Sequence, residues 1–277
     1  MIYDTIVVGS GPAGIAASIQ LRRAGFKLIL LEKNKIGGLL NNASLIENYP
    51  GFPGGIFGKD LVRLFQKQLE KCGAQVKFGE VESIGKKNNF IIKTTTKTFY
   101  AKSIIVASGS VPKKLELNGH AHLLEKKLFY ELSQIPSITG KTITVIGSGD
   151  IAFDYALNIA NTAKKVNLFI KNNKPTCIPI LLKQALKKSN IKIYKSSISN
   201  FSNVSSDYFL VAIGREKKLP FIKKNWQKLL AANSNSLESL GLFLAGDAKL
   251  QNFRHTAIAV GDGLNTAMKV EAFLRCQ

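Results

Sequence analysis

Short apolar runs separated by glycine-rich turns recur along the chain of 277 residues. Runs rich in β-branched residues and leucine, and too short for helices, are typical of the buried strands of a parallel sheet. Such runs lie at residues 5–8, 27–31, 103–110, 141–146, 166–170, 208–214 and 241–247, three of them ending in small residues or Gly-Asp. Apolar residues spaced three and four apart predict helices at residues 15–24, 59–72, 151–160 and 255–274. Because strands and helices alternate, the sequence predicts an α/β fold, with a β-meander at residues 76–99.

The first apolar run enters a G-x-G-x-x-G turn, formed by Gly9-Ser10-Gly11-Pro12-Ala13-Gly14. In this fingerprint Gly9 permits the tight turn, Gly11 lets the backbone approach a pyrophosphate, and Gly14 lets helix and strand pack closely. The helix that follows directs its unpaired N–H groups toward the phosphates. The next strand ends on Glu32, whose carboxylate can accept hydrogen bonds from both hydroxyls of an adenosine ribose. This arrangement predicts a dinucleotide site.

The same strand, turn and helix recur at residues 141–160, with the turn Gly147-Ser148-Gly149-Asp150-Ile151-Ala152. The partner strand is followed by Lys171 rather than by an acid. A cation at that place favours the 2′-phosphate of NADPH over the free ribose of NADH. The duplication suggests one site for a tightly held flavin nucleotide and one for a nicotinamide nucleotide.

Two further strand ends have features that suit a flavin. Ala107-Ser108-Gly109 ends one strand in small residues, which let the backbone lie against a flat ligand. Gly246-Asp247 ends another and precedes a helix. The carboxylate can lie beside the ribityl hydroxyls, while the helix N-terminus faces the pyrimidine end of the ring and stabilises negative charge there. The alternative interpretation of Asp247 is a capping residue with no ligand.

Composition excludes several classes of protein. With 45% hydrophobic residues and a mean hydropathy of +0.05, the chain is typical of a soluble globular protein. No apolar run is long enough to span a bilayer, and the first strand begins without a preceding signal peptide. Cys72, Cys177 and Cys276 are far apart and form no C-x-x-C pair. Their spacing predicts a reducing, cytoplasmic location and offers neither a metal site nor a local redox dithiol.

The formal net charge of +21 comes mostly from lysines that are spread along the chain in pairs. One interpretation is a lysine-rich exposed surface with no specific role. The other is attraction of an acidic partner protein or an anionic substrate. Nucleic acid is disfavoured, because the chain has no recognition helix, zinc motif or basic strand interleaved with aromatic residues.

Together these motifs resemble the thioredoxin-reductase-like branch of the FAD-dependent pyridine nucleotide-disulfide oxidoreductases. The resemblance covers nearly the whole chain and rests on both glycine turns, Glu32, Gly37-Gly38, Glu47-Asn48-Tyr49-Pro50-Gly51, Gly246-Asp247 and Arg254-His255-Thr256. It implies two Rossmann-like (doubly wound, three-layer) dinucleotide-binding domains, the second inserted in the first. The implied FAD-binding domain comprises residues 1–112 and 237–277, and a shortened NAD(P)-binding-like domain comprises residues 113–236. A cytoplasmic, homodimeric oxidoreductase is implied as well.

The resemblance also assigns cofactor contacts to particular residues. For FAD they are Gly9, Ser10, Gly11, Pro12, Ala13, Gly14, Glu32, Lys33, Gly38, Leu39, Asn48, Val81, Ala107, Ser108, Gly109, Gly246, Asp247, Arg254, His255 and Thr256. For NAD(P) they are Gly147, Ser148, Gly149, Asp150, Ile151 and Lys171. His255 is placed at the flavin pyrimidine edge, where a donor stabilises charge at N1 and O2. No other side chain is assigned to catalysis, and no metal-binding constellation is visible.

The chain departs from the family pattern in three respects. Thioredoxin reductases carry a C-x-x-C before the second glycine turn, where this chain has Phe129-Tyr130-Glu131-Leu132-Ser133-Gln134-Ile135-Pro136. Electrons therefore cannot leave the flavin by thiol–disulfide exchange in the usual way, which argues against a thioredoxin reductase proper. Asn172 and Asn173 follow Lys171, so most of the basic cluster for a 2′-phosphate is missing. The C-terminal extension usual in thiol-free ferredoxin–NADP reductases of this family is also not evident.

Four functional hypotheses remain open. The favoured one is an FAD-dependent oxidoreductase that passes electrons between NAD(P)H and an external acceptor, such as ferredoxin, flavodoxin or a small molecule. The second is a nicotinamide-independent flavoenzyme with a degenerate second domain. The third is a dithiol relay through isolated cysteines, which would need Cys177 near the flavin. The fourth is a non-catalytic FAD-binding protein.

Overall fold

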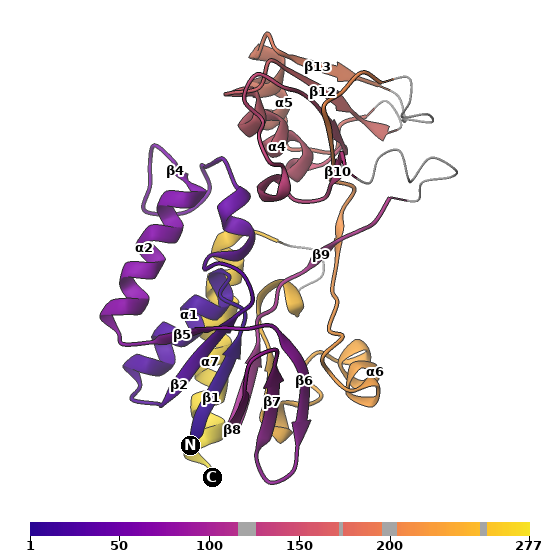
Figure 1. Cartoon of the computed structure of the whole chain (residues 1–277). Helices are drawn as coiled ribbons and strands as arrows, with labels where there is room; N and C mark the ends of the chain where they lie inside the picture. Colours follow the sequence, from indigo (N-terminus) through magenta and orange to yellow (C-terminus); the bar gives the residue numbers. More distant parts are fainter. Residues whose placement is uncertain (116–125, 172–173, 196–203, 250–253) are drawn as a thin grey trace. The chain divides into compact units, whose positions relative to one another are not determined.

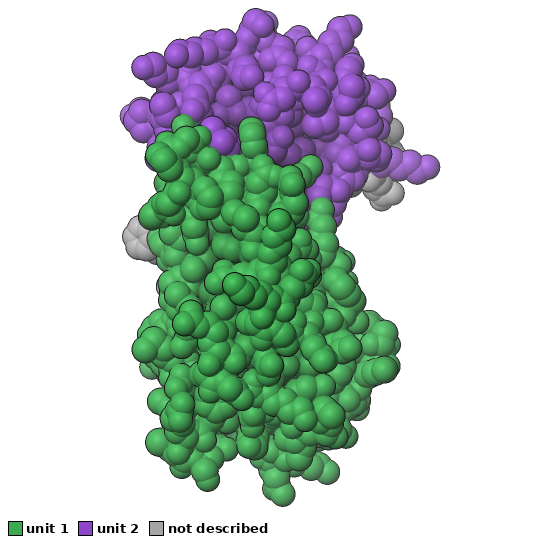
Figure 2. Space-filling view, turned by 90° about the vertical axis from the view of Figure 1, so that its left-hand side faces the viewer, with its two compact units in different colours: residues 1–41, 46–110, 217–277 green, residues 42–45, 111–216 purple. Residues whose placement is uncertain are grey.

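The computed structural model describes residues 1–115, 126–171, 174–195, 204–249 and 254–277 (Figure 1). Its chain divides into two compact units (Figure 2). Unit 1 comprises residues 1–41, 46–110 and 217–277, and unit 2 comprises residues 42–45 and 111–216. The fold is α/β with two separate, largely parallel sheets, and unit 2 is inserted in unit 1, as the sequence predicts.

The sheet of unit 1 has the strand order β5-β2-β1-β8-β7-β6, and β16 also pairs with β8. The first half of β8 pairs antiparallel with β7, and its second half pairs parallel with β16. These strands are β1 (Ile2–Val8), β2 (Leu28–Glu32), β5 (Gln75–Phe78), β6 (Val81–Lys86), β7 (Phe90–Thr94), β8 (Thr98–Val106) and β16 (Leu242–Leu244). A separate short pair is formed by β3 (Leu45–Ile46) and β4 (Ile56–Phe57).

Helices cover one face of this sheet, where α1 and α7 lie side by side (Figure 1). Val7 of β1 points to that face, and its neighbours Ile6 and Val8 point to the other, because side chains alternate along a strand. On the second face, Ile6 and Val8 belong to a core cluster that also contains side chains of β6 and β7, Ile222 and Leu230. The helices and turns of unit 1 are α1 (Pro12–Arg23), η1 (Gly38–Asn42), α2 (Gly58–Lys71), α6 (Lys224–Ala232), η5 (Glu238–Leu240), η6 (Gly246–Ala248) and α7 (Thr256–Arg275).

The predicted meander at residues 76–99 is only partly correct. Strands β6, β7 and β8 do form an antiparallel meander, with Phe90 opposite Lys86 on one side and Ala101 on the other. The strand that begins at Gln75, however, pairs parallel with β2 at the far edge of the sheet. Gly79 separates the two regions and donates its backbone N–H to Glu32 O at 2.8 Å. Alternation of apolar residues identifies a strand but not its partner, so the sequence pattern could not separate them.

Within its described residues, unit 2 contains a five-stranded parallel sheet of order β10-β14-β11-β12-β13. Its larger helices, α4 and α5, follow β11 and β12 respectively. The elements of this unit are β9 (Val111–Pro112), β10 (Leu128–Phe129), η2 (Leu132–Gln134), β11 (Thr142–Ile146), α4 (Asp150–Ala160), β12 (Lys165–Phe169), α5 (Pro179–Lys187), β13 (Ile191–Tyr194), β14 (Tyr208–Val211) and β15 (Arg215–Glu216).

Residues 217–236 group with unit 1, whereas the boundary predicted from the sequence lies at 236/237. The backbone explains the difference, because Ile84 of β6 donates its N–H to Phe221 O at 2.9 Å. The ring of Trp226 also packs edge-on against Phe90 of β7. Among the described residues, no helix is long and apolar enough to cross a membrane.

Candidate functional site

Three turns of unit 1 leave the same edge of its sheet. Val106 of β8 is level with Val8 of β1 on one side and with Leu244 of β16 on the other. The strands are parallel, so residues 9–14, 107–109 and 245–247 all follow carboxyl ends at that edge. In open α/β sheets this edge is where ligands bind.

The first glycine turn forms a cradle that larger residues would fill. A Cβ atom on Gly9, whose φ is +100°, would lie 2.4 Å from Ala107 O, and one on Gly14 would lie 1.9 Å from Gly9 O. A Cβ on Gly11 would meet nothing within 4 Å, so the space over this residue is open. Pro12 and Ala13 begin α1, whose first turn contains no acid, so its N-terminus suits an anion.

Glu32 is fixed by the same turn. It accepts hydrogen bonds at Oε2 from Ser10 N at 2.9 Å and Ser10 Oγ at 2.7 Å, and at Oε1 from Asn34 N at 2.9 Å. Its side chain is 9% exposed. Since a carboxylate has about four acceptor sites and three of them are used here, one remains for a ribose hydroxyl.

Asp247 lies in η6, directly after β16, and two residues hold its carboxylate. Ser110 Oγ donates to Asp247 Oδ2 at 3.1 Å, and Arg254 Nε lies 3.9 Å from the same oxygen. The position after a parallel strand and the polar partners fit a carboxylate that faces hydroxyl groups.

Asp262 supports this turn and was missed by the sequence analysis. It lies in α7 and accepts at Oδ2 the backbone N–H of Gly246, at 2.8 Å, while Lys249 Nζ lies 2.9 Å from Oδ1. Lys249 and Asp262 are only 15% and 10% exposed. The pair fixes the backbone that carries Asp247. An acid in the second turn of a largely apolar helix, with a lysine in the preceding loop, is the signal that could have found it.

His255 and Asn48 meet at the start of α7. Asn48 Nδ2 lies 3.3 Å from His255 Nδ1, although the residues are far apart in sequence. His255 is the N-cap residue and Thr256 the first residue of the helix, which has no acid in its first turn. The structure therefore brings the predicted pyrimidine-edge donor to an electropositive helix end.

The other predicted FAD residues lie at or near this edge. Gly38 packs over the first turn, since a Cβ on it would lie 3.4 Å from Gly11 Cα. Leu39 is half-buried in η1, Ala107 is buried, and Ser108 and Gly109 are more exposed. Lys33 follows Glu32 and lies 3.9 Å from Glu80 at the surface. Val81 belongs to the core beside Val8 and Leu31.

These features fit FAD. The open space over Gly11 and the acid-free start of α1 suit a pyrophosphate, Glu32 suits the adenosine ribose, and the edge that carries Asp247 and His255 suits the ribityl chain and ring. Two residues of this edge hold others in place, since Ser10 donates to Glu32 and Gly246 donates to Asp262. Gly14 lets α1 approach the backbone of Gly9 closely.

The second glycine turn, in unit 2, repeats the geometry of the first. A Cβ on Gly147 would lie 2.3 Å from Ala212 O of the neighbouring strand end, as one on Gly9 would approach Ala107 O. Gly149 and Asp150 lead into α4, and Ile151 is exposed beside them. Asp150 Oδ1 accepts the N–H of Ile178 at 2.8 Å.

The register of β11 with β12 shows what replaces Glu32 in unit 2. Val8 is level with Leu31 in unit 1, and Ile146 is level with Phe169 in unit 2, so Ile170 takes the place of Glu32. Ile170 is 1% exposed, and Lys171 follows at the surface with its N–H donated to Ser148 Oγ at 2.9 Å. Unit 2 thus has no carboxylate at this position. Asn172 and Asn173 lie outside the described residues.

Glu131, in the segment where the family dithiol would lie, is the centre of a buried polar network. Arg215 Nη1 lies 2.7 Å from Oε1, while Tyr155 Oη at 3.1 Å and Asn42 Nδ2 at 3.0 Å donate to Oε2. Burial and the neighbouring Glu131 carboxylate raise the pKa of Tyr155, so its hydroxyl stays a donor. The sequence analysis missed this network because its members are spread over four segments.

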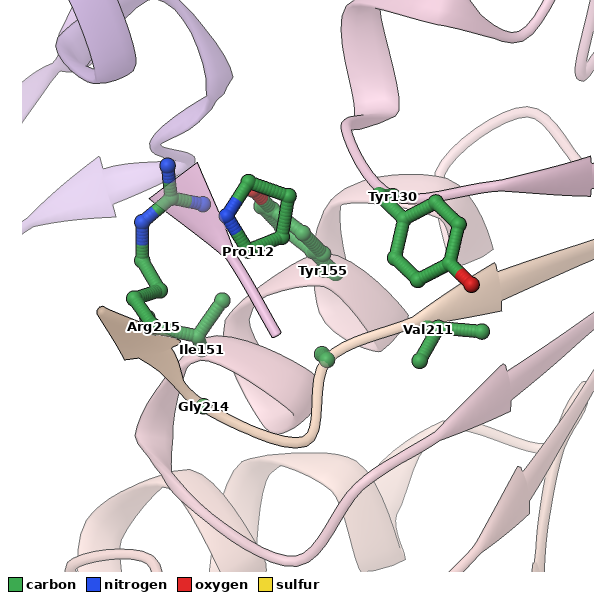
Figure 3. Close-up of a pocket in the computed structure, with 8 residues that line it drawn as sticks. Pro112, Tyr130, Ile151, Tyr155, Val211, Gly214 and Arg215 are labelled. Atoms are coloured by element: carbon green, nitrogen blue, oxygen red, sulfur yellow. The ribbon is translucent and has the colours of Figure 1, made fainter. Parts of the chain in front are cut away.

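Figure 3 shows the small cavity beside this network, at the carboxyl end of β14. Its lining residues are Pro112, Tyr130, Ile151, Tyr155, Val211, Ala212, Gly214 and Arg215. Nearby, Asp154 Oδ2 accepts the N–H of Ser44 at 3.3 Å, and burial raises the pKa of Asp154 to about 6. These contacts tie residues 42–45 to α4.

All three cysteines are free. Cys72 lies just after α2, Cys276 just after α7, and Cys177 in the loop before α5. Burial, followed by the nearby Asp150 carboxylate, raises the pKa of Cys177, which lowers its thiolate fraction. Nothing in these positions resembles a redox dithiol.

Comparisons with known proteins identify the family of the chain. The family described as pyridine nucleotide-disulphide oxidoreductase matches residues 3–263. A thioredoxin reductase of Helicobacter pylori is 29% identical over 312 aligned residues, which cover 99% of each chain. The crystal structure of the thioredoxin reductase of T. acidophilum superposes with a TM-score of 0.82 at 25% identity, covering 98% of each chain. A ferredoxin-flavin thioredoxin reductase from Clostridium acetobutylicum, with a TM-score of 0.56, 23% identity and 100% and 98% coverage, shares the fold.

The matched range includes both glycine turns, Glu32 and Asp247, so the likeness extends over the sites as well as the fold. The C-x-x-C motif is nevertheless missing from the sequence. The chain belongs to the pyridine nucleotide-disulphide oxidoreductase family and is a thioredoxin reductase-like flavin oxidoreductase without the cysteine pair.

Proposed function

We propose that this protein is an FAD-dependent oxidoreductase that takes electrons from NAD(P)H and passes them to an external acceptor without an active-site dithiol. The observation that carries the proposal is the difference between its two glycine turns. Beside the turn of unit 1, the neighbouring strand ends at Glu32, whose carboxylate accepts a hydrogen bond from that turn. Beside the turn of unit 2, the equivalent position is Ile170, followed by the exposed Lys171. Two different nucleotides are therefore expected, in a chain that has no C-x-x-C.

The proposed roles of the residues follow from their contacts. Glu32 holds the adenosine ribose of FAD, and Asp247 holds the ribityl chain. His255, oriented by Asn48, donates to the pyrimidine edge. Bound FAD supplies the redox chemistry, since it accepts a hydride from NAD(P)H and returns two electrons to an acceptor, singly or together. Lys171 pairs with the 2′-phosphate, which makes NADPH the preferred donor.

The proposed acceptor is an acidic electron carrier such as ferredoxin or flavodoxin, with a small molecule as the alternative. The support is the net charge of +21, which attracts a negatively charged protein and accelerates association. The proposed location is the cytoplasm, and its support is that three free cysteines suit reducing conditions.

The proposed assembly is a homodimer. Its support is three exposed apolar residues of α7, Ile258, Leu264 and Met268, which are 39%, 39% and 62% exposed. An acidic carrier would not select exposed apolar side chains, whereas a second copy can bury them. Sedimentation should give the dimer mass for the wild type and the monomer mass for Met268→Lys; a wild-type monomer would contradict the assignment.

The deciding experiment is anaerobic titration of the purified yellow protein with NADH and NADPH in parallel, followed by flavin absorbance. Reduction by NADPH at lower concentrations than NADH is expected, and Lys171→Ala should raise the KM for NADPH while leaving that for NADH little changed. A flavin that neither nucleotide reduces, but that a reduced carrier does reduce, would replace this proposal by the nicotinamide-independent alternative.

A second experiment identifies the acceptor and the electron path. Turnover with a ferredoxin or flavodoxin should fall steeply as salt is raised, because screening shortens the reach of charge attraction to about 10 Å at 0.1 M. Turnover with a neutral quinone should barely change. Replacing Cys72, Cys177 and Cys276 together by serine should leave both activities nearly intact. Loss of both activities in that variant would contradict the proposal and support electron transfer through the cysteines.

A further inference from the structure

In each unit, the chain returns to its glycine turn after the second strand of the repeat. In unit 1, Gly37 donates its backbone N–H to Ser10 O at 2.8 Å. In unit 2, Thr176 donates its backbone N–H to Ser148 O at 2.7 Å. Ser10 and Ser148 occupy the same position of the two turns. Gly37 and Thr176 are therefore equivalent residues of the internal repeat.

The two returning segments present different chemistry to the second glycine of the turn. Unit 1 brings Gly38 to Gly11, and a Cβ on Gly11 would meet no other atom within 4 Å. In unit 2, a Cβ on Gly149 would lie 3.7 Å from Thr176 Oγ1. The second glycine is the residue that lets the backbone approach a pyrophosphate. A hydroxyl group thus stands at the phosphate position of unit 2, where unit 1 has none.

The segment that carries this hydroxyl is fixed at both ends. Thr176 is held to the turn through Ser148 O, and Ile178 donates its N–H to Asp150 Oδ1 at 2.8 Å. Pro175 and Pro179 flank the segment and restrict its backbone further. The Thr176 side chain is exposed, so it is accessible to a ligand. Little conformational entropy is lost when such a fixed hydroxyl forms a hydrogen bond.

We propose that Thr176 is a phosphate-binding residue of unit 2, whose hydroxyl donates a hydrogen bond to the pyrophosphate of the nicotinamide nucleotide. This inference rests on the proposed function and deepens it. The pyrophosphate is common to NADH and NADPH, so Thr176 contributes equally to both. Lys171, by contrast, separates the two through the 2′-phosphate. Thr176 is thus assigned to affinity for both nucleotides, and Lys171 to selectivity between them.

The test measures binding rather than turnover. ADP-ribose and 2′-phospho-ADP-ribose contain the pyrophosphate but no nicotinamide, so they bind without transferring electrons. Their dissociation constants for the FAD-loaded protein are measured by calorimetry, with flavin absorbance as the check that each variant is folded. Thr176→Val should raise both constants by about tenfold, because a hydrogen bond to a charged group is lost. Thr176→Ser should retain wild-type affinity.

Two further variants complete the design. Thr162→Val alters an exposed threonine after α4, away from the turn, and should leave both constants unchanged. Lys171→Ala should weaken only 2′-phospho-ADP-ribose. Equal affinity of Thr176→Val and wild type, or equal losses in Thr176→Val and Thr176→Ser, would overturn the role of the hydroxyl while leaving the proposed function standing. A wild type that binds neither compound would overturn both.

Discussion

Glu131 accepts a hydrogen bond from Arg215 across 84 residues of sequence, at 2.7 Å, and the two side chains are 15% and 7% exposed. The ion pair joins β15 to the start of η2. Such a pair is costly to break from one side, because the remaining charge stays buried without a partner.

Glu131→Ala should therefore lower the free energy of unfolding by about 3–5 kcal/mol. Urea unfolding followed by circular dichroism measures the loss. The matched control is Arg275→Ala, which breaks the exposed Glu271–Arg275 pair and should cost less than about 1 kcal/mol. Similar losses in the two variants would show that the buried pair contributes no more than a surface one.

Glu32→Ala should weaken FAD binding, because a charged acceptor for the adenosine ribose is removed. The expected cost is about 1.5–3 kcal/mol per charge-assisted hydrogen bond, measured by flavin fluorescence on reconstitution of the apoprotein. Glu82→Ala is the control, since Glu82 is an exposed acid of β6 outside the predicted FAD contacts and should leave the affinity unchanged. Full flavin occupancy with wild-type affinity in Glu32→Ala would remove this site from the FAD assignment.

Asp262→Ala should also weaken FAD binding, by about tenfold, although Asp262 acts through the turn and not on the cofactor. It leaves the N–H of Gly246 and the charge of Lys249 without their partner. Asp262→Asn keeps an acceptor for Gly246 and should retain more of the affinity. If the two variants lose the same amount in reconstitution titrations, the charge pair rather than the backbone contact orients the turn.

Asp154 should make stability depend on pH. Its pKa is raised from 3.8 to about 6 by burial, so between pH 4 and 6 the folded state binds more protons than the unfolded state. The contribution of Asp154 to stability therefore falls as pH rises through this window and stays low above it. Asp154→Asn should stabilise the protein above pH 7, by about 1 kcal/mol more at pH 8 than at pH 5. Equal effects at the two pH values in urea unfolding would contradict the raised pKa.

The sequence predicts those parts of the molecule whose determinants are local. The Gly9–Gly14 turn, its strand and its helix are contiguous, and Glu32 is one strand further on, so spacing alone identifies them. The second turn at Gly147 is found by the same pattern. Helix α2 begins and ends within one residue of its predicted bounds, because its apolar face is a local periodic signal.

The parts that were missed depend on distant residues. The contact of Asp262 with Gly246 requires α7 to pack back over the turn, and the Glu131 network joins residues as far apart as Asn42 and Arg215. The equivalence of Ile170 with Glu32 requires the register of two strand pairs. The Glu131 network and the strand register leave no spacing signal in the sequence, since the chain between the partners is long. Asp262 is only 16 residues from Gly246, but no recognised motif has this spacing.

The packing of α7 against α1 has a consequence for how the protein is made. A Cβ on Gly263 would lie 2.2 Å from Ala13 O, so the two helices touch through their backbones, and β16 fills the place beside β8. Both partners of these contacts belong to unit 1, yet residues 111–216 are synthesised between them. Unit 2 therefore has its whole sequence outside the ribosome before unit 1 can close. Until then the apolar surfaces of α1 and β8 lack their partners, and chaperones are expected to bind the nascent chain during this interval.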